Sequence, residues 1–134
     1  MSKNSMPRVA PYLFYEDVPG ALAWLSKAFG FRERMRQPGP DGRIRHAEMD
    51  VDVDGVILLG CPGPQYRNPK QLGTMTQTLY IQVDDVDAHC ARARDAGALT
   101  VEQPADQEYG DRRYGAEDPE GHRWYFAQPV HRTE

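Results

Sequence analysis

The sequence has only two cysteines, Cys61 and Cys90, which is too few for a disulfide framework, and we expect both to be reduced thiols. It has no apolar run close to the roughly 20 residues that cross a bilayer, and its first residues lack the apolar core of a signal peptide. It also lacks an excess of positive charge: the net charge is −4, whereas nucleic-acid-binding domains are normally basic. These absences predict a cytoplasmic protein that binds neither membranes nor nucleic acids.

What remains has the composition of an ordinary globular domain. Hydrophobic residues make up 40% of the 134 residues and charged residues 27%, so residues 1–134 are expected to form a single domain with a buried core. No glycine-rich phosphate loop is present; Cys61 has no base close to it in the sequence, and Cys90 lies in a predicted helix. Nucleotide binding and catalysis by a cysteine nucleophile are therefore not indicated.

An internal repeat is the most informative feature of the sequence. The segment Tyr-Leu-Phe-Tyr-Glu-Asp-Val at residues 12–18 matches Tyr-Ile-Gln-Val-Asp-Asp-Val at residues 80–86, an offset of 68 positions. A second pair of turns, Asp54-Gly55 and Glu120-Gly121, closes each half at an offset of 66. Two matches in the same order and at nearly the same offset indicate a duplication.

Each half is predicted to fold as β-α-β-β-β. The modules are expected over residues 7–61 and 76–128, joined by a proline- and glycine-containing linker at 62–75. Strands are predicted at 9–15, 31–36, 43–53 and 56–59 in the first module and at 78–83, 99–102, 112–117 and 122–126 in the second, with a loop at 104–110. Helices are predicted at 19–28 and 85–96, with Asp17 capping the first and Gly30 and Gly97 ending them. The fold class is therefore α+β with mixed sheets.

The segments that carry this pattern are YLFYEDVPGALAWLSKAFGF, LYIQVDDVDAHCARARDAGA and YGDRRYGAEDPEGHRW. Together they resemble the vicinal oxygen chelate superfamily, which contains glyoxalase I, bleomycin-resistance proteins and extradiol dioxygenases. The resemblance covers residues 9 to 128. It implies a glyoxalase-like fold in which the curved sheets of two modules form a shared cavity, usually in a homodimer. Such scaffolds host many activities, so the resemblance alone does not assign the chemistry.

The metal ligands of the superfamily are missing from the expected positions. Metal-dependent members place one ligand on the first strand and one on the last strand of each module. The resemblance assigns these positions to Ala10, Leu59, Thr78 and Tyr125. Divalent metals of this kind need imidazole or carboxylate donors, and a slip of one residue supplies none. The resemblance therefore implies a member without the inherited metal site, and we expect no metal and no other cofactor.

The same positions predict which side chains line the cavity, because alternate residues of a strand share a face. The first and last strands then contribute Tyr12, Phe14, Ile57, Tyr80, Gln82, Arg123 and Tyr125. If two-residue turns set the register, Asp50 lies opposite Leu59 and Ala116 opposite Tyr125. This register adds His46, Glu48, Asp50 and Tyr114, and the loop residue Tyr109 is a candidate lid. A slip of one residue would turn the added set outward. Trp124 and Phe126 are expected in the core.

An aromatic cavity with a few carboxylates suits a small aromatic or cationic molecule. The leading interpretation is a metal-independent binding protein similar to the drug-sequestering members of the superfamily. Four alternatives stay open. The tyrosines belong to an ordinary core, or His46 and Glu48 form a salt-bridged strand face near Arg43 and Arg45. Alternatively, the chain is a lyase, isomerase or dioxygenase type of enzyme using an unrecognised site, with Glu48 as base and a tyrosine as proton donor. A pure interaction protein with a closed cavity is the remaining possibility.

Overall fold

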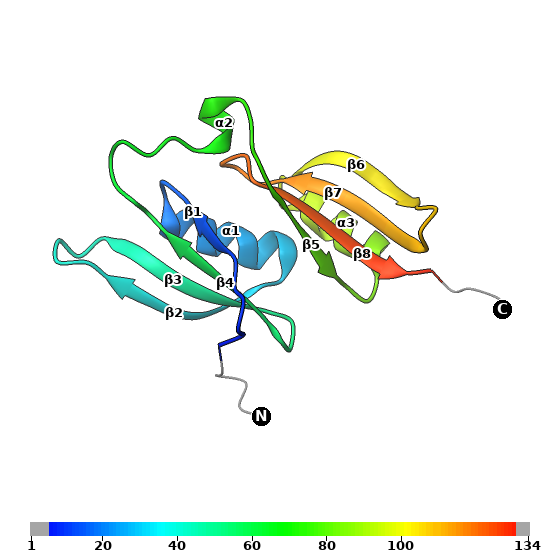
Figure 1. The fold of residues 1–134 in the computed structure, drawn as a ribbon, viewed down its shortest axis with the longest axis horizontal. Helices are drawn as coiled ribbons and strands as arrows, with labels where there is room; N and C mark the ends of the chain where they lie inside the picture. Colours follow the sequence, from blue (N-terminus) through cyan, green and yellow to red (C-terminus); the bar gives the residue numbers. More distant parts are fainter. Residues whose placement is uncertain (1–5, 131–134) are drawn as a thin grey trace. The chain divides into compact units, whose positions relative to one another are not determined.

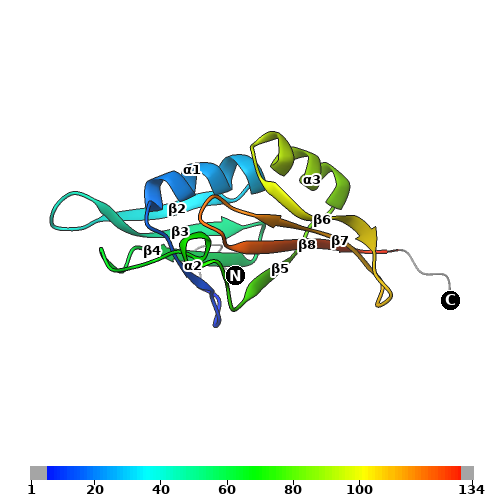
Figure 2. The same ribbon diagram turned by 90° about the horizontal axis from the view of Figure 1, so that it is seen from above.

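The computed structural model describes residues 6–130 and divides the chain into two compact units, with the boundary between Asn68 and Pro69. In the first unit, four strands form one sheet and a single helix covers one of its faces (Figures 1 and 2). The elements are β1 (Tyr12–Phe14), α1 (Val18–Phe29), β2 (Arg32–Pro38), β3 (Ile44–Val51) and β4 (Gly55–Gly60). The strand order is β1-β4-β3-β2, with β1 parallel to β4 and the other pairs antiparallel.

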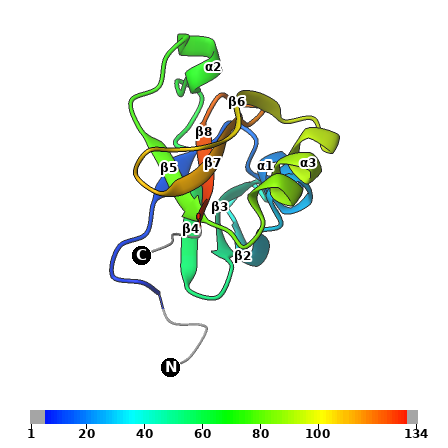
Figure 3. The ribbon, with the colours of Figure 1, turned by 90° about the vertical axis from the view of Figure 1, so that its right-hand side faces the viewer.

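The second unit repeats this plan after a short helix, and α3 covers one face of its sheet (Figure 3). Its elements are α2 (Pro69–Leu72), β5 (Thr78–Gln82), α3 (Val86–Asp95), β6 (Leu99–Asp106), β7 (Asp111–Glu117) and β8 (Arg123–Pro129). The order β5-β8-β7-β6 corresponds strand for strand to the first sheet. The predicted α+β class and the two β-α-β-β-β modules are confirmed.

The two long helices begin at side-chain caps. Asp17 accepts a hydrogen bond from the backbone nitrogen of Gly20 at 3.0 Å, and Asp85 accepts one from Ala88 at 3.1 Å. Both bonds satisfy an amide that has no partner inside its helix. Gly30 ends α1 in the left-handed region with φ 79°, a conformation that disfavours residues with a Cβ. The predicted starts and stops of both helices therefore agree with the structure to within two residues.

Each core lies between the helix and the covered face of its sheet. In the first unit the buried face is aliphatic, whereas in the second it is largely aromatic. The main contributors are Leu22, Leu25, Met49 and Leu59 in the first unit and Val86, Cys90, Tyr114, Trp124 and Phe126 in the second. Trp124 and Phe126 are completely buried, as predicted. Within the described residues, the opposite face of each sheet carries no helix of its own unit, and we call these the first and second open faces.

Strand β6 is longer than predicted, because a proline does not end it. The sequence predicts a strand at 99–102 and a loop from Pro104, but β6 continues to Asp106. Pro104 lies where the pairing with β7 is irregular, between Glu102 and Ala105. At such a bulge the missing proline N–H removes no bond of the ladder, so the strand continues past it.

The predicted register of the β3–β4 hairpin is wrong. Asp50 pairs with Val56 and not with Leu59, which pairs with Ala47. The turn holds the three residues 52–54, since Val51 pairs with Gly55, and Asp52 adopts the left-handed φ of 55° that the tight turn requires. A longer turn shifts the pairing of every residue in the hairpin.

The β7–β8 register is also wrong, by one residue. Ala116 pairs with Trp124, and Gly115 pairs with Tyr125. The carboxylate of Asp118 explains the shift, because its Oδ1 accepts hydrogen bonds at 3.0 Å from the backbone nitrogens of Glu120 and His122. These bonds stabilise a turn of five residues, 118–122, in place of the expected two.

Candidate functional site

The first open face collects five of the predicted site residues. Tyr12 and Phe14 of β1 pair in parallel with Leu58 and Gly60 of β4, and Leu58 and Gly60 pair with residues of β3. Paired residues share a face of the sheet, so this side carries Tyr12, Phe14, His46, Glu48 and Asp50. Ile57 and Leu59, predicted to face the same way, are turned toward α1 and are 2% and 0% exposed.

A chain of polar contacts connects Tyr12, His46 and Glu48. The Tyr12 hydroxyl lies 3.2 Å from His46 Nδ1, and His46 Nε2 lies 3.7 Å from Glu48 Oε2. The ring of Phe14 meets Tyr12 edge-to-face with a centroid separation of 5.5 Å. A phenol, an imidazole and a carboxylate are thereby aligned along one exposed surface beside two aromatic rings.

Arg34, which the sequence did not single out, neutralises the carboxylates of this face. Its Nε lies 3.5 Å from Glu48 Oε1 and its Nη1 lies 3.6 Å from Asp50 Oδ1, and its side chain is 13% exposed. The expected salt-bridged strand face is present, but Arg34 forms it in place of Arg43 and Arg45. The alternation of arginines along β2 at 32, 34 and 36 is the only sequence signal that points to it.

The second open face holds four further predicted residues. Tyr80 pairs in parallel with Tyr125, and the same register places Gln82 and Arg123 on this side. The Tyr80 hydroxyl donates a hydrogen bond to Asp111 Oδ2 at 2.5 Å and lies 3.0 Å from the hydroxyl of Tyr109. Partial burial together with the neighbouring Asp111 carboxylate raises the pKa of Tyr80, so its phenol stays protonated.

Arg113 organises the rest of this face, although its sequence context gave no sign of this role. Its guanidinium lies 5.0 Å from the centre of the Tyr125 ring and makes two hydrogen bonds to Glu102, at 2.7 and 3.2 Å. It also donates to the Tyr109 hydroxyl at 3.2 Å. Tyr109, the candidate lid, is therefore held by contacts to both Tyr80 and Arg113.

The predicted orientation of Tyr114 is wrong. It pairs with Phe126, so it lies on the face covered by α3 and is completely buried. Its hydroxyl lies 2.5 Å from Nδ1 of His89 on α3, and burial raises the pKa of Tyr114. The one-residue error in the β7–β8 register accounts for the mistake. In the first unit, His46, Glu48 and Asp50 were nevertheless predicted on the correct face, because two errors cancelled. The β3–β4 register was wrong, and Leu59 was assigned to the wrong face.

The residues at the metal positions of the superfamily do not fit a divalent ion. Tyr12 pairs with Leu58 as Tyr80 pairs with Tyr125, so Leu58 rather than Leu59 is the counterpart of Tyr125. Ala10 and Leu58 have no donor atom, and a threonine or neutral tyrosine is a poor ligand. Within residues 6–130 no three His, Cys, Asp or Glu side chains are grouped closely enough to hold a metal. His131 lies outside the described residues.

Comparison with known proteins identifies the family. A sequence profile of the glyoxalase/bleomycin resistance protein/dioxygenase superfamily matches residues 6–126. The chain belongs to this superfamily. Uncharacterised proteins of Mycobacterium bovis and of Mycobacterium tuberculosis strain H37Rv are each 38% identical to it over 97% of this chain, covering 88% and 79% of their own lengths.

Solved structures of the superfamily share the fold. TioX from Micromonospora sp. ML1 is 34% identical, with a TM-score of 0.76 over 93% of this chain and 100% of its own. TnmS3, an antibiotic binding protein from Streptomyces sp. CB03234, is 21% identical, with a TM-score of 0.64 over 95% of this chain and 100% of its own. No helix within residues 6–130 of this superfamily member is long and apolar enough to span a membrane.

Proposed function

We propose that this chain is a metal-independent binder of a small aromatic or cationic molecule, and that the open faces of its sheets supply the contacts. The observation that carries the proposal is the exposure of large aromatic side chains. Tyr12 is 52% exposed, Phe14 42%, Tyr80 45% and Tyr109 55%. Aromatic rings dominate binding energies where they are buried against a partner, and their gathering on one side of each sheet favours a ligand that covers them.

The charges around these rings favour an aromatic ligand over a cationic one. Glu48 and Asp50 share the guanidinium of Arg34, and Glu102 is paired with Arg113. Carboxylates that are already paired attract an added cation less strongly. A flat ring system stacked on the tyrosines, with polar substituents that hydrogen-bond to His46 or Gln82, agrees best with this surface.

The family context is compatible with this function. TnmS3 has the same fold and is an antibiotic binding protein, which supports a small-molecule ligand for this chain. A cytoplasmic location and a homodimer belong to the proposal as well. The assignment of residues 7–61 and 76–128 as modules joined by a linker at 62–75 is also part of the proposal.

A thermal-shift screen tests the proposal. The panel pairs planar aromatic dyes, cationic and neutral, with aliphatic amines of equal charge. A ligand at 100 times its Kd adds about 2.7 kcal/mol to the free energy of unfolding, which is readily measured. We expect aromatic compounds to stabilise the protein, and Tyr12→Ala and Tyr80→Ala to weaken their binding. Val53→Ala, at an 84% exposed turn residue, is the matched control. If no aromatic compound stabilises the protein, the proposal is contradicted.

The contact chain on the first open face favours an enzyme as the second candidate. The sequence suggested Glu48 as the base, but Arg34 holds Glu48, whereas His46 contacts the Tyr12 hydroxyl. His46 is therefore the better proton acceptor, with Glu48 orienting it. Mass spectrometry of ligands recovered from the screen separates the two functions. An unchanged ligand supports binding alone, whereas conversion by the wild type and not by His46→Gln supports catalysis.

A further inference from the structure

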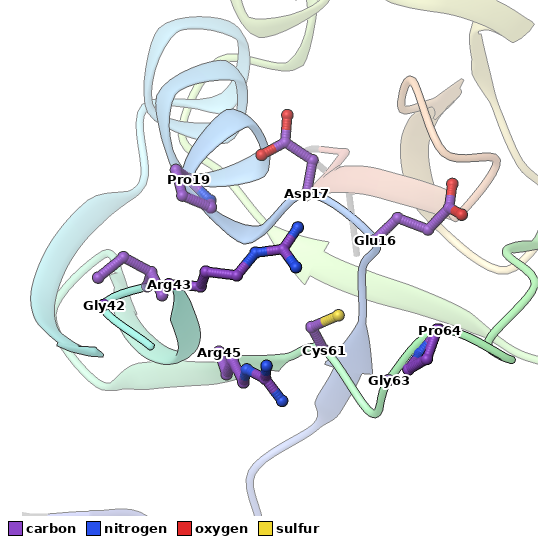
Figure 4. Close-up of a pocket in the computed structure, with 10 residues that line it drawn as sticks. Glu16, Asp17, Pro19, Gly42, Arg43, Arg45, Cys61, Gly63 and Pro64 are labelled. Atoms are coloured by element: carbon purple, nitrogen blue, oxygen red, sulfur yellow. The ribbon is translucent and has the colours of Figure 1, made fainter. Parts of the chain in front are cut away.

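The first unit has a pocket that none of the predicted site residues lines. It holds about 600 Å³, a size typical of small-molecule sites. The turn between β1 and α1 forms one wall, the end of the β2–β3 hairpin forms another, and the segment that follows β4 closes it. Figure 4 shows its lining side chains.

The pocket has a guanidinium on one wall and two acidic residues on another, whose carboxylates are directed to α1 and to Asn68. Arg43 extends its guanidinium from the hairpin toward the β1–α1 turn, which carries Glu16 and Asp17 (Figure 4). Across residues 6–130, Arg43 makes no ion pair with any carboxylate. Its neighbour Arg45 is already paired with Asp41 at 2.8 Å. The guanidinium of Arg43 is therefore available to a ligand within the pocket.

The acidic wall is fixed in position by the fold. Asp17 caps α1 through its bond to Gly20, and Glu16 accepts a hydrogen bond at 3.3 Å from Asn68, which is 6% exposed. Groups held in this way lose little conformational freedom when a ligand binds. A fixed negative wall opposite a guanidinium disfavours a simple anion but suits a molecule that carries both charges.

We propose that this pocket binds a small zwitterion. Its carboxylate pairs with the guanidinium of Arg43, which presents two parallel N–H donors that match a carboxylate. Its ammonium group faces Glu16 and Asp17. The site lies within the first unit and does not involve the open faces, so it is independent of the proposed aromatic ligand.

Cys61 provides a reporter for this pocket. Its side chain lines the cavity and is half-buried, whereas Cys90, the other cysteine, is 2% exposed and lies in the core of the second unit. A molecule in the pocket shields Cys61 from alkylation by iodoacetamide, and mass spectrometry follows the two thiols separately. Cys90 is then the internal reference for intact folding.

Three probes of equal chain length test the charge requirement at low salt: 5-aminovalerate, valerate and pentylamine. At two-thirds occupancy, 5-aminovalerate slows alkylation of Cys61 about threefold. We expect valerate at the same concentration to protect less, and pentylamine not to protect. Equal protection by valerate and 5-aminovalerate, or no protection by any probe, overturns the proposal.

Variants connect the protection to Arg43. Arg43→Gln is expected to abolish protection by 5-aminovalerate, and Arg43→Lys to weaken it, because lysine keeps the charge but loses the two-pronged contact. Arg92→Gln, on α3 in the other unit, is the matched control and should retain full protection. If Arg43→Gln is still protected, the assignment is wrong. Should that variant not fold, the comparison of the three probes on the wild type still decides.

Discussion

Tyr12 lies across the backbone of Gly60, so closely that a Cβ at position 60 would be 2.7 Å from the tyrosine hydroxyl oxygen and 2.8 Å from the ring. This approach brings the hydroxyl to His46, which lies opposite Gly60 on β3. In the second sheet a tyrosine also lies over a glycine, although here the two are paired across β7 and β8: a Cβ at Gly115 would be 2.6 Å from the ring of Tyr125. A glycine beneath a tyrosine therefore fixes the height of the ring on each open face.

The variant Gly60→Ala tests this role. We expect the added methyl group to displace the exposed Tyr12 ring and to break its contact with His46. The free energy of unfolding falls by less than about 1 kcal/mol, because the ring moves without disturbing the core. Binding of an aromatic ligand identified in the screen weakens about threefold to tenfold. Gly39→Ala is the control, since its nearest neighbours lie at ordinary contact distance, 3.5 Å or more. Equal affinities for the two variants would contradict this role.

The buried phenol of Tyr114 makes stability sensitive to high pH. Its pKa is raised in the folded state, so the unfolded chain releases this proton first as the pH rises through about 10. Stability that is present below that pH is then lost, by about 1.4 kcal/mol at a pH of about 11. In Tyr114→Phe this loss is absent. Urea denaturation at several pH values should show that the free energy of unfolding of the wild type falls relative to that of Tyr114→Phe above pH about 10. A difference that stays constant with pH contradicts the prediction.

Asp118 determines the β7–β8 turn and should be important for stability. The carboxylate is 3% exposed and accepts hydrogen bonds from two backbone nitrogens and, at 3.1 Å, from the indole nitrogen of Trp124. Asp118→Ala leaves these buried donors without an acceptor and lowers the free energy of unfolding by about 2–4 kcal/mol. Asp118→Asn retains one oxygen and costs less. Asp54→Ala, at the exposed counterpart turn, should change stability by no more than about 0.5 kcal/mol in urea denaturation.

The donor chemistry at the superfamily metal positions leads to a fourth prediction. Protein purified without chelator should contain less than about 0.1 equivalents of zinc, nickel, manganese or iron, because Ala10, Leu58, Thr78 and Tyr125 do not form a ligand set. The melting temperature should be the same before and after treatment with EDTA. A stoichiometric ion whose removal lowers the melting temperature would refute this expectation.

The sequence was sufficient for the architecture, because caps, turns and the duplication are local signals that repeat. Asp17 and Gly30 mark the ends of a helix by their own chemistry, and each match between the halves supports the other. The register of the β3–β4 and β7–β8 hairpins could not be predicted in the same way. It depends on how many residues a turn holds, and this number is set by Asp52 adopting a left-handed conformation and by the hydrogen bonds of Asp118.

The candidate site shows the same limit. Residues on β1 and β5 were placed on the open faces by the ligand positions of the superfamily and strand alternation, which do not depend on the hairpin register. Tyr114 was misplaced because its face depends on the β7–β8 register. Arg34 and Arg113 were missed because an arginine on a strand looks like ordinary solvated charge until its cross-strand acidic partner is known.

The separation of each sheet into a packed side and an open side has an evolutionary consequence. Residues that meet α1 and α3 are locked together by close packing, so substitutions there are costly. Positions such as Tyr12, His46 and Tyr80 have their rings turned away from that interior and can be exchanged one at a time with little loss of folding. If the proposed ligand covers these faces, natural selection can change which molecule is bound in a few mutational steps while the backbone stays the same.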